Sequence, residues 1–298
     1  MSAERLASVP VPMEVLVRIV DADPDRRVIS RLRTMDRRET FGFSTVETRG
    51  VCIDTETTGL DPTSDRIVEL AVQTFGVDAR GRIVETGRQH GWLEDPGMPL
   101  PEECKRVTRL TDADVRGRSI CDGEAYAILS SAQVIVAHNA AFDRPFLERR
   151  FPELKGARWA CSMSEVDWEG LGFIGRKLEL LALQTGWFYK AHRATIDVTA
   201  LLHLLDHVLD DGSTVLGRML ERAARPTWVV TAPDVPWGRG DALRARGWRW
   251  DRERRLWLRE MSDEEVDREM EWVTTNVYHA VRVPERERVD WTTRFSRP

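Results

Sequence analysis

Apolar residues between positions 49 and 224 follow two spacings, short runs of strand length and stretches of helical period. Their alternation along the chain is typical of an α/β domain. The apolar runs predict strands at residues 50–56, 66–78, 82–94 and 132–139. Only a short turn separates the second strand from the third, so these two are expected to pair as an antiparallel hairpin.

Helical spacing and capping residues predict the helices of the same region. Small helices are expected within 101–117, opened by a proline or a Thr/Asp cap, and a longer one at 122–131. A helix at 140–151 follows from the apolar positions in "AAFDRPFLERRF". Another helix is expected to begin at a cap on Thr195, with an apolar face formed by Val198, Leu201, Leu202, Leu205 and Leu209.

Changes in residue composition along the chain predict three segments. Residues 1–48 are polar and arginine-rich and are assigned only as an N-terminal extension. A boundary near Pro226 is expected because seven of the eleven tryptophans follow it. Residues 49–224 then form the α/β domain, and residues 225–298 form a small Trp/Arg-rich α+β module.

Within this C-terminal module we expect a strand, a helix at about 239–246, a tight strand pair, and a helix that starts in a capping box of Ser262 and Glu265. Alternation in "WRWDRERRLWL" turns tryptophans towards a core and arginines outwards. The row of Trp248, Trp250 and Trp257 is therefore read as core. The arginine face remains a candidate for binding single-stranded nucleic acid.

Composition limits the class of protein. The chain is 42% apolar and 31% charged, as in soluble globular proteins, and it contains no apolar run long enough for a membrane span. Its start lacks a secretory signal pattern, so a cytoplasmic location is expected. The four cysteines are scattered and are interpreted as reduced thiols. A net charge of -5 excludes global attraction to nucleic acid, which leaves local patches and metal.

Candidate chemistry begins at the end of the first strand. Side chains alternate across a strand, so Cys52, Asp54 and Glu56 share one face. Two carboxylates on one face repel each other unless a cation lies between them, and oxygen ligands favour a hard divalent metal. The alternative is a solvated strand end with an ordinary turn acid.

Two further acids open predicted helices. Asp143 lies in the first turn after the strand at 132–139, and Asp197 lies five residues after His192, which we place in a loop. Each acid could simply complement a helix dipole, and His192 could be an ordinary loop histidine. The position of Asp143 just beyond the carboxyl end of a strand favours a ligand site.

Together the motifs resemble the DEDDh branch of the DnaQ-like 3'-5' exonucleases. The residues that carry the resemblance are "DTETTG" at 54–59, "HNAAFD" at 138–143 and "HRATID" at 192–197, in that order along residues 49–210. The acids and the histidine of the family pattern are all present. Arg109 departs from the pattern, because relatives commonly carry glycine there.

The resemblance implies an RNase H-like mixed sheet with flanking helices. It also implies two Mg2+ ions, or Mn2+, with Asp54 bridging both ions, Glu56 and Asp197 completing one, and Asp143 helping to hold the other. His192 would be the general base, since histidine exchanges protons near neutral pH. The residues implied to hold the terminal nucleotide are Thr57, Leu60, Asn139 and Phe142.

The expected activity is hydrolysis of phosphodiester bonds from the 3' end of single-stranded DNA, with release of 5'-mononucleotides. Partners are then nucleic-acid 3' ends, with DNA preferred over RNA, and no membrane. An RNA-trimming or oligoribonucleotide-degrading exonuclease is one alternative. A non-catalytic nucleic-acid-binding member of the fold is another. We find no clamp-docking peptide in the sequence, so no polymerase or repair partner is predicted.

Overall fold

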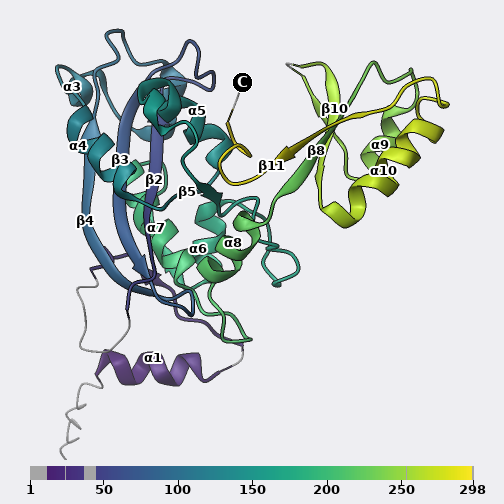
Figure 1. Ribbon diagram of the computed structural model, residues 1–298. Coiled ribbons are helices and arrows are strands. Elements are labelled where there is room, and N and C mark those ends of the chain that lie inside the picture. Colours follow the sequence, from purple (N-terminus) through teal and green to yellow (C-terminus); the bar gives the residue numbers. More distant parts are fainter. Residues whose placement is uncertain (1–11, 24, 37–44, 253, 297–298) are drawn as a thin grey trace, which may run out of the picture.

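A five-stranded mixed sheet forms the centre of the first part of the chain (Figure 1). The computed structural model describes residues 12–23, 25–36, 45–252 and 254–296. In spatial order the strands are β4 (Ile83–Leu93), β3 (Ile67–Val77), β2 (Thr48–Thr57), β5 (Val134–Ala137) and β6 (Trp159–Cys161). β2, β3 and β4 pair antiparallel, whereas β2, β5 and β6 are parallel. The predicted antiparallel hairpin of β3 and β4 is confirmed. The short strand β6, which pairs with β5, was not predicted.

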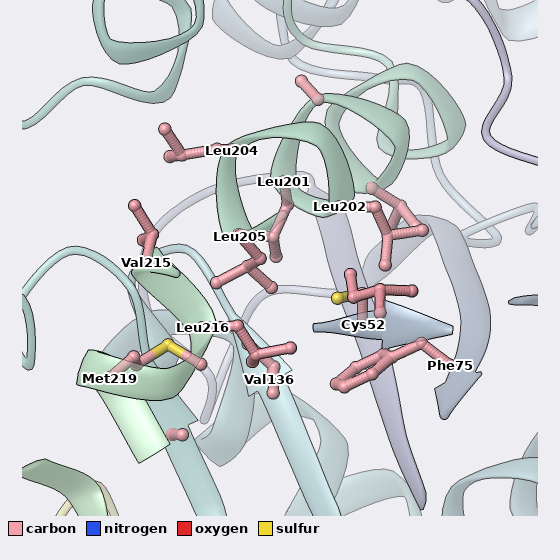
Figure 2. Packing of buried hydrophobic residues seen from close by; sticks show 14 of the residues in the cluster. Cys52, Phe75, Val136, Leu201, Leu202, Leu204, Leu205, Val215, Leu216 and Met219 are labelled. Atoms are coloured by element: carbon pink, nitrogen blue, oxygen red, sulfur yellow. The ribbon is translucent and has the colours of Figure 1, made fainter. Parts of the chain in front are cut away.

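Helices cover both faces of this sheet. On one face lie α6 (Leu178–Gln184), α7 (Ala194–Leu205) and α8 (Val215–Ala224). Figure 2 shows leucines of α7 above Cys52 and Phe75 of the sheet. The other face carries α4 (Asp122–Ser131) and α5 (Ala140–Arg150), which pack on the apolar side chains that alternate with Cys52. The chain therefore has the RNase H-like α/β fold that was expected.

Most of the predicted helices are present. The short pair is α2 (Glu102–Thr108) and α3 (Asp112–Val115), and α3 begins in a capping box of Thr111 and Asp114. The predicted cap on Thr195 is wrong, because α7 begins at Ala194 and Thr195 lies inside its first turn. Leu209 lies beyond the end of α7 yet packs into the same core. Among the described residues, no helix has the length and apolar character needed to cross a bilayer.

The predicted N-terminal extension falls partly on residues 1–11, 24 and 37–44, which lie outside the described residues. The described remainder contains α1 (Met13–Asp21) and β1 (Ser30–Arg31), which pairs in parallel with β7 (Trp187–Phe188). Met35 is buried, and its carbonyl accepts hydrogen bonds from Gln73 and Thr86. Residues 30–36 thus pack against the central sheet and α7.

A second, antiparallel sheet lies in the C-terminal part of the chain (Figure 1). Its strands are, in spatial order, β11 (Glu285–Val289), β8 (Thr227–Pro233), β10 (Leu256–Met261) and β9 (Arg249–Asp251). The helices α9 (Gly240–Ala245) and α10 (Asp263–Asn276) contribute to its own apolar core. The predicted capping box of Ser262 and Glu265 opens α10. The sequence analysis missed β11.

The tryptophans of the second sheet do not all face its core. Trp248 and Trp257 are buried as expected, but Trp250 is 46% exposed, so its assignment to the core is wrong. Trp250 is the cross-strand partner of Trp257 and contacts its ring edge-on. Because β9 is an edge strand, no further strand of the described residues covers the other side of Trp250.

The last described residues return to the first sheet. Residues 290–296, here called the C-terminal strap, lie beside α5 (Figure 1). The amide of Trp159 in the edge strand β6 donates to the carbonyl of Trp291 at 2.7 Å. The buried guanidinium of Arg144 in α5 binds Glu148 and also donates to the carbonyls of Trp291 and Thr292. The strap therefore closes one edge of the central sheet.

Candidate active site

Carboxylates from β2 and α7 converge at the end of the central strand. Asp54 and Glu56 follow Cys52 on the face of β2 that packs against α7, as the alternation predicts. Asp197 projects from the first turn of α7 towards them. Carboxylate oxygens of the three residues all lie within 4.8 Å of one another. Helix and strand thus supply a three-carboxylate group from residues far apart in the sequence.

Three donors hold the carboxylate of Asp197. The Tyr189 hydroxyl donates to Oδ1 at 3.0 Å, and the amides of His192 and Arg193 donate to Oδ2 at 2.8 and 3.0 Å. Asp197 thus satisfies the amides of His192 and of the N-cap residue Arg193, which directly precede the helix. The sequence analysis missed Tyr189, because a lone aromatic residue eight positions before an acid follows no recognisable spacing.

Asp143 lies in the first turn of α5, where the sequence places it, and it is only 2% exposed. Its Oδ1 accepts hydrogen bonds from the amide of Thr55 at 3.1 Å and from the hydroxyl of Thr55 at 2.7 Å. Asp143 is not one of the three carboxylates grouped above. It is close enough for its charge to raise the pKa of Asp54.

Burial and mutual repulsion raise the pKa values of this group. Burial is the largest cause at Asp54, whose pKa lies well above its ordinary value. Burial and then the charge of Asp197 raise the pKa of Glu56 to about 8. Burial likewise raises the pKa of Asp197, and it raises the pKa of Asp143 to about 7. Without a cation the carboxyl groups of Glu56 and Asp143 therefore retain protons near neutral pH.

The donor chemistry of the group matches a hard divalent cation. All three grouped residues offer carboxylate oxygens, and neither nitrogen nor sulfur ligands belong to the set. Arg193, the arginine whose charge lowers the pKa of Glu56, is itself bound to Glu69. A bound Mg2+ or Mn2+ would offset the repulsion and displace the protons that the carboxyl groups otherwise hold.

The other residues predicted for the site lie at or just beyond the ends of β2 and β5 and just before α7. His192 is exposed on the turn before α7 and has a left-handed backbone, with φ of 69°. Leu60 follows the end of β2 and is 81% exposed. The hydroxyl of Thr57 donates to the carbonyl of Gly59. Asn139, also left-handed, precedes α5, and Phe142 packs partly buried against Phe146 at 5.1 Å between ring centroids.

Known proteins resemble the part of the chain that carries these residues. The profile of the family described as Exonuclease (RNase_T) matches residues 51–205. The DNA polymerase III subunit epsilon of Treponema pallidum is 29% identical over 183 residues, which is 58% of this chain and 82% of that protein. A DNA polymerase III subunit epsilon-like protein of Rhodobacter capsulatus is 39% identical over 103 residues, 34% of this chain but only 14% of that protein.

Two solved structures show a partial likeness. Exonuclease X in complex with 5' overhanging duplex DNA is 24% identical in sequence. The match covers 56% of this chain and 99% of the exonuclease X chain, with a TM-score of 0.41. E. coli exonuclease I in complex with a dA16 oligonucleotide is 15% identical and covers 62% of this chain and 48% of its own, with a TM-score of 0.42.

Metal binding should stabilise the protein more strongly at high pH. In EDTA the raised pKa of Glu56 means that the folded state holds a proton which the unfolded state releases. The free energy of unfolding therefore falls as the pH rises from about 4.5 to about 8. Metal has to displace this proton, and its binding strengthens as pH rises. We expect the gain in Tm from Mn2+ over EDTA to be several degrees larger at pH 8 than at pH 6.

The variant Glu56→Gln removes the titrating group and should flatten this pH dependence. Glu153→Gln, at an exposed acid in the short 3-10 helix Pro152–Leu154 that follows α5, is the matched control and should behave like wild type. Equal Tm gains at both pH values in the wild-type protein would contradict the interpretation of the carboxylate group as a metal site.

Proposed function

The chain belongs to the Exonuclease family, and on this basis we propose that it is a metal-dependent 3'-5' exonuclease acting on single-stranded DNA. It hydrolyses the terminal phosphodiester bond and releases 5'-mononucleotides. The observation that carries the proposal is the group formed by Asp54, Glu56 and Asp197, whose carboxylate oxygens lie within 4.8 Å of one another. Such a group is costly in a partly buried place unless it binds cations.

Four carboxylates would hold two Mg2+ or Mn2+ ions. We assign Asp54 to both ions, Glu56 and Asp197 to one, and Asp143 to the other. When bound, the ions supply the Lewis acidity that activates water and stabilises charge developing on the phosphate. The protein supplies orientation, because Thr55 holds Asp143 and Tyr189 holds Asp197 before any substrate arrives.

His192 acts as the general base in this proposal. The imidazole takes the proton of the attacking water, and the electron pair of that O–H bond forms the new P–O bond. The P–O bond to the 3'-oxygen of the preceding nucleotide breaks, and this oxygen leaves with the electron pair and is then protonated. Its exposure on a turn gives it access to a bound nucleic-acid end, while its own amide remains bonded to Asp197. The base is therefore tethered to a metal-binding carboxylate through the backbone.

The residues assigned to the terminal nucleotide lie around the carboxylates. Leu60 is a large apolar side chain that is 81% exposed, which supports a role in stacking on the last base. Thr57 lies at the end of β2, and Asn139 and Phe142 lie at the start of α5, on either side of the strand end. We propose that these residues hold the 3' end against the carboxylate group.

The reaction itself is the first test. A gel time course with 5'-labelled single-stranded DNA and RNA of one sequence, in Mg2+ and in EDTA, should show a ladder shrinking from the 3' end of DNA in Mg2+ only. Asp54→Asn should abolish the ladder while leaving the fold intact, because it removes the ligand shared by both ions. Near-normal turnover by this variant would contradict the two-ion assignment.

The same gel decides between the alternatives. The carboxylates serve DNA and RNA alike, so a ladder on RNA alone would replace the DNA proposal with an RNA-trimming or oligoribonucleotide-degrading enzyme. Intact substrate in every metal lane would favour a non-catalytic nucleic-acid-binding protein. A cytoplasmic location and nucleic-acid 3' ends as partners remain part of the proposal, and no polymerase partner is included.

His192→Ala should lower the rate by about 100- to 10,000-fold, the usual range for loss of a general base. Binding of the oligonucleotide, measured in Ca2+ by anisotropy, should change little, because the metal-binding carboxylates remain. His203→Ala is the matched control, since His203 lies on α7 with its imidazole on the carbonyl of Arg33. A wild-type rate for His192→Ala would reject the assignment of the base.

For residues 225–298 we propose a separate module that grips the single strand. Of the seven arginines between 244 and 259, three bind carboxylates: Arg244, Arg246 and Arg259. The other four are exposed: Arg249, Arg252, Arg254 and Arg255. The turn between β9 and β10 adjoins the end of β8, where the next loop carries the fully exposed Trp237. Arginine beside an exposed aromatic ring suits phosphate and base together.

Point variants test this surface better than a deletion, because removal of the tail would also remove the C-terminal strap from α5. Replacing Trp237 by Ala and the arginines 252, 254 and 255 by Ser should weaken single-stranded DNA binding about tenfold or more and reduce its salt dependence. The matched control removes equal charge at exposed arginines elsewhere: Arg80, Arg88 and Arg222. Equal affinity and equal salt slope for the two variants would reject the surface.

A further inference from the structure

The turn that carries His192 is short and conformationally demanding. The backbone of His192 is left-handed, a conformation that is unfavourable for residues other than glycine. The carboxylate of Asp197 holds the amides of His192 and Arg193, but these bonds fix only the end of the turn next to α7. Two arginines connect the turn to other elements: Arg193 of the turn binds β3, and Arg109 at the end of α2 binds the turn.

Arg193 anchors the turn to the central sheet. Its guanidinium binds the carboxylate of Glu69 through two hydrogen bonds of 3.0 and 3.3 Å, and Glu69 is only 2% exposed. Glu69 in β3 is the cross-strand partner of Glu56 in β2. The residue next to the proposed base is therefore fixed to the strand beside the one that supplies Asp54 and Glu56.

Arg109 anchors the turn from the opposite direction. It ends α2 with a left-handed backbone, φ 62°, at a position where glycine is the usual residue. Its Nη1 donates at 3.0 Å to the carbonyl of Ala191, the residue immediately before His192, and Ala191 is buried. The backbone of Arg109 is strained, while its side chain makes a contact that glycine cannot make.

We propose that Arg109 and Arg193 are positioning residues that together clamp the His192 turn over the carboxylate group. The inference rests on the proposed exonuclease function, in which His192 is the base. Arg193 holds the turn to β3, and Arg109 holds it to the end of α2. In this chain a strained arginine occupies a position that glycine usually takes, so Arg109→Gly should raise stability and lower turnover.

Arg109→Gly tests the clamp. Glycine relieves the left-handed strain, so Tm should rise by about 2 °C. Loss of one charged hydrogen bond should lower kcat about fivefold and leave KM for the oligonucleotide unchanged. Amide hydrogen exchange at residues 190–193 should become about fivefold faster, because the turn opens more often. A merely structural role would move Tm and kcat in the same direction.

Two variants separate the tether from the strain. Arg109→Ala keeps the left-handed backbone but loses the donor, so both Tm and kcat should fall. Arg109→Lys keeps a donor, and its kcat should stay within about twofold of wild type. The control is Arg106→Ala, on the same helix, where the arginine pairs only with its neighbour Glu103 and all readouts should match wild type.

The outcomes distinguish the two proposals. Wild-type kcat and wild-type exchange in Arg109→Gly would overturn the clamp while leaving the exonuclease proposal intact. A raised KM with unchanged kcat would also overturn it, since Arg109 would then contact nucleic acid directly. If the wild-type protein hydrolyses no substrate, the proposed function fails, and the exchange rates at residues 190–193 still decide whether Arg109 restrains the turn.

Discussion

Repulsion among carboxylates at the end of β2 is the constraint on which the rest of the structure depends. Asp54, Glu56 and Asp197 approach within 4.8 Å although burial makes each charge expensive. A fold tolerates such a cluster only when the surrounding elements are rigid enough to prevent the acids from turning away. The leucine-rich packing of α7 on Cys52 and Phe75, which Figure 2 shows, supplies this rigidity.

The nearby arginine does not neutralise the carboxylate group, which therefore remains available to bind cations. Arg193 could have neutralised Glu56, yet its guanidinium is bound to Glu69 on the neighbouring strand. Asp143 and Asp197 receive hydrogen bonds from the neutral groups of Thr55 and Tyr189 and from backbone amides, which orient a carboxylate without cancelling its charge. The protein thus separates the task of orienting the acids from the task of neutralising them.

Periodicity alone predicted the parts of the site that lie on regular elements. The alternation across β2 predicted that Asp54 and Glu56 share one face with Cys52, and the short turn predicted the antiparallel hairpin of β3 and β4. The fold class and the family are confirmed. The predicted cap at Thr195 was wrong, because the N-cap of α7 is Arg193, which makes no side-chain cap hydrogen bond and follows no capping pattern in the sequence. Tyr189 was not predicted, because its contact with Asp197 follows no recognisable spacing in the sequence.

Errors in the C-terminal part have a different origin. The burial of Trp250 depends on which strand lies at the edge of the sheet, and alternation carries no information about strand order. The strap at residues 290–296 was likewise beyond prediction, since it lies in the chain far from Trp159 and Arg144, which it contacts.

The strap also sets an order of events during synthesis. Arg144, next to Asp143 in α5, has a fully buried guanidinium whose carbonyl partners belong to Trp291 and Thr292. The last strand of the central sheet, β6, ends at Cys161 and leaves the ribosome about 130 residues before Trp291, roughly ten seconds at ordinary elongation rates. During that interval the edge strand β6 and the helix bearing Asp143 are incomplete. A nascent chain therefore holds the helix that bears Asp143 without its strap contacts until residues 290–296 have been synthesised.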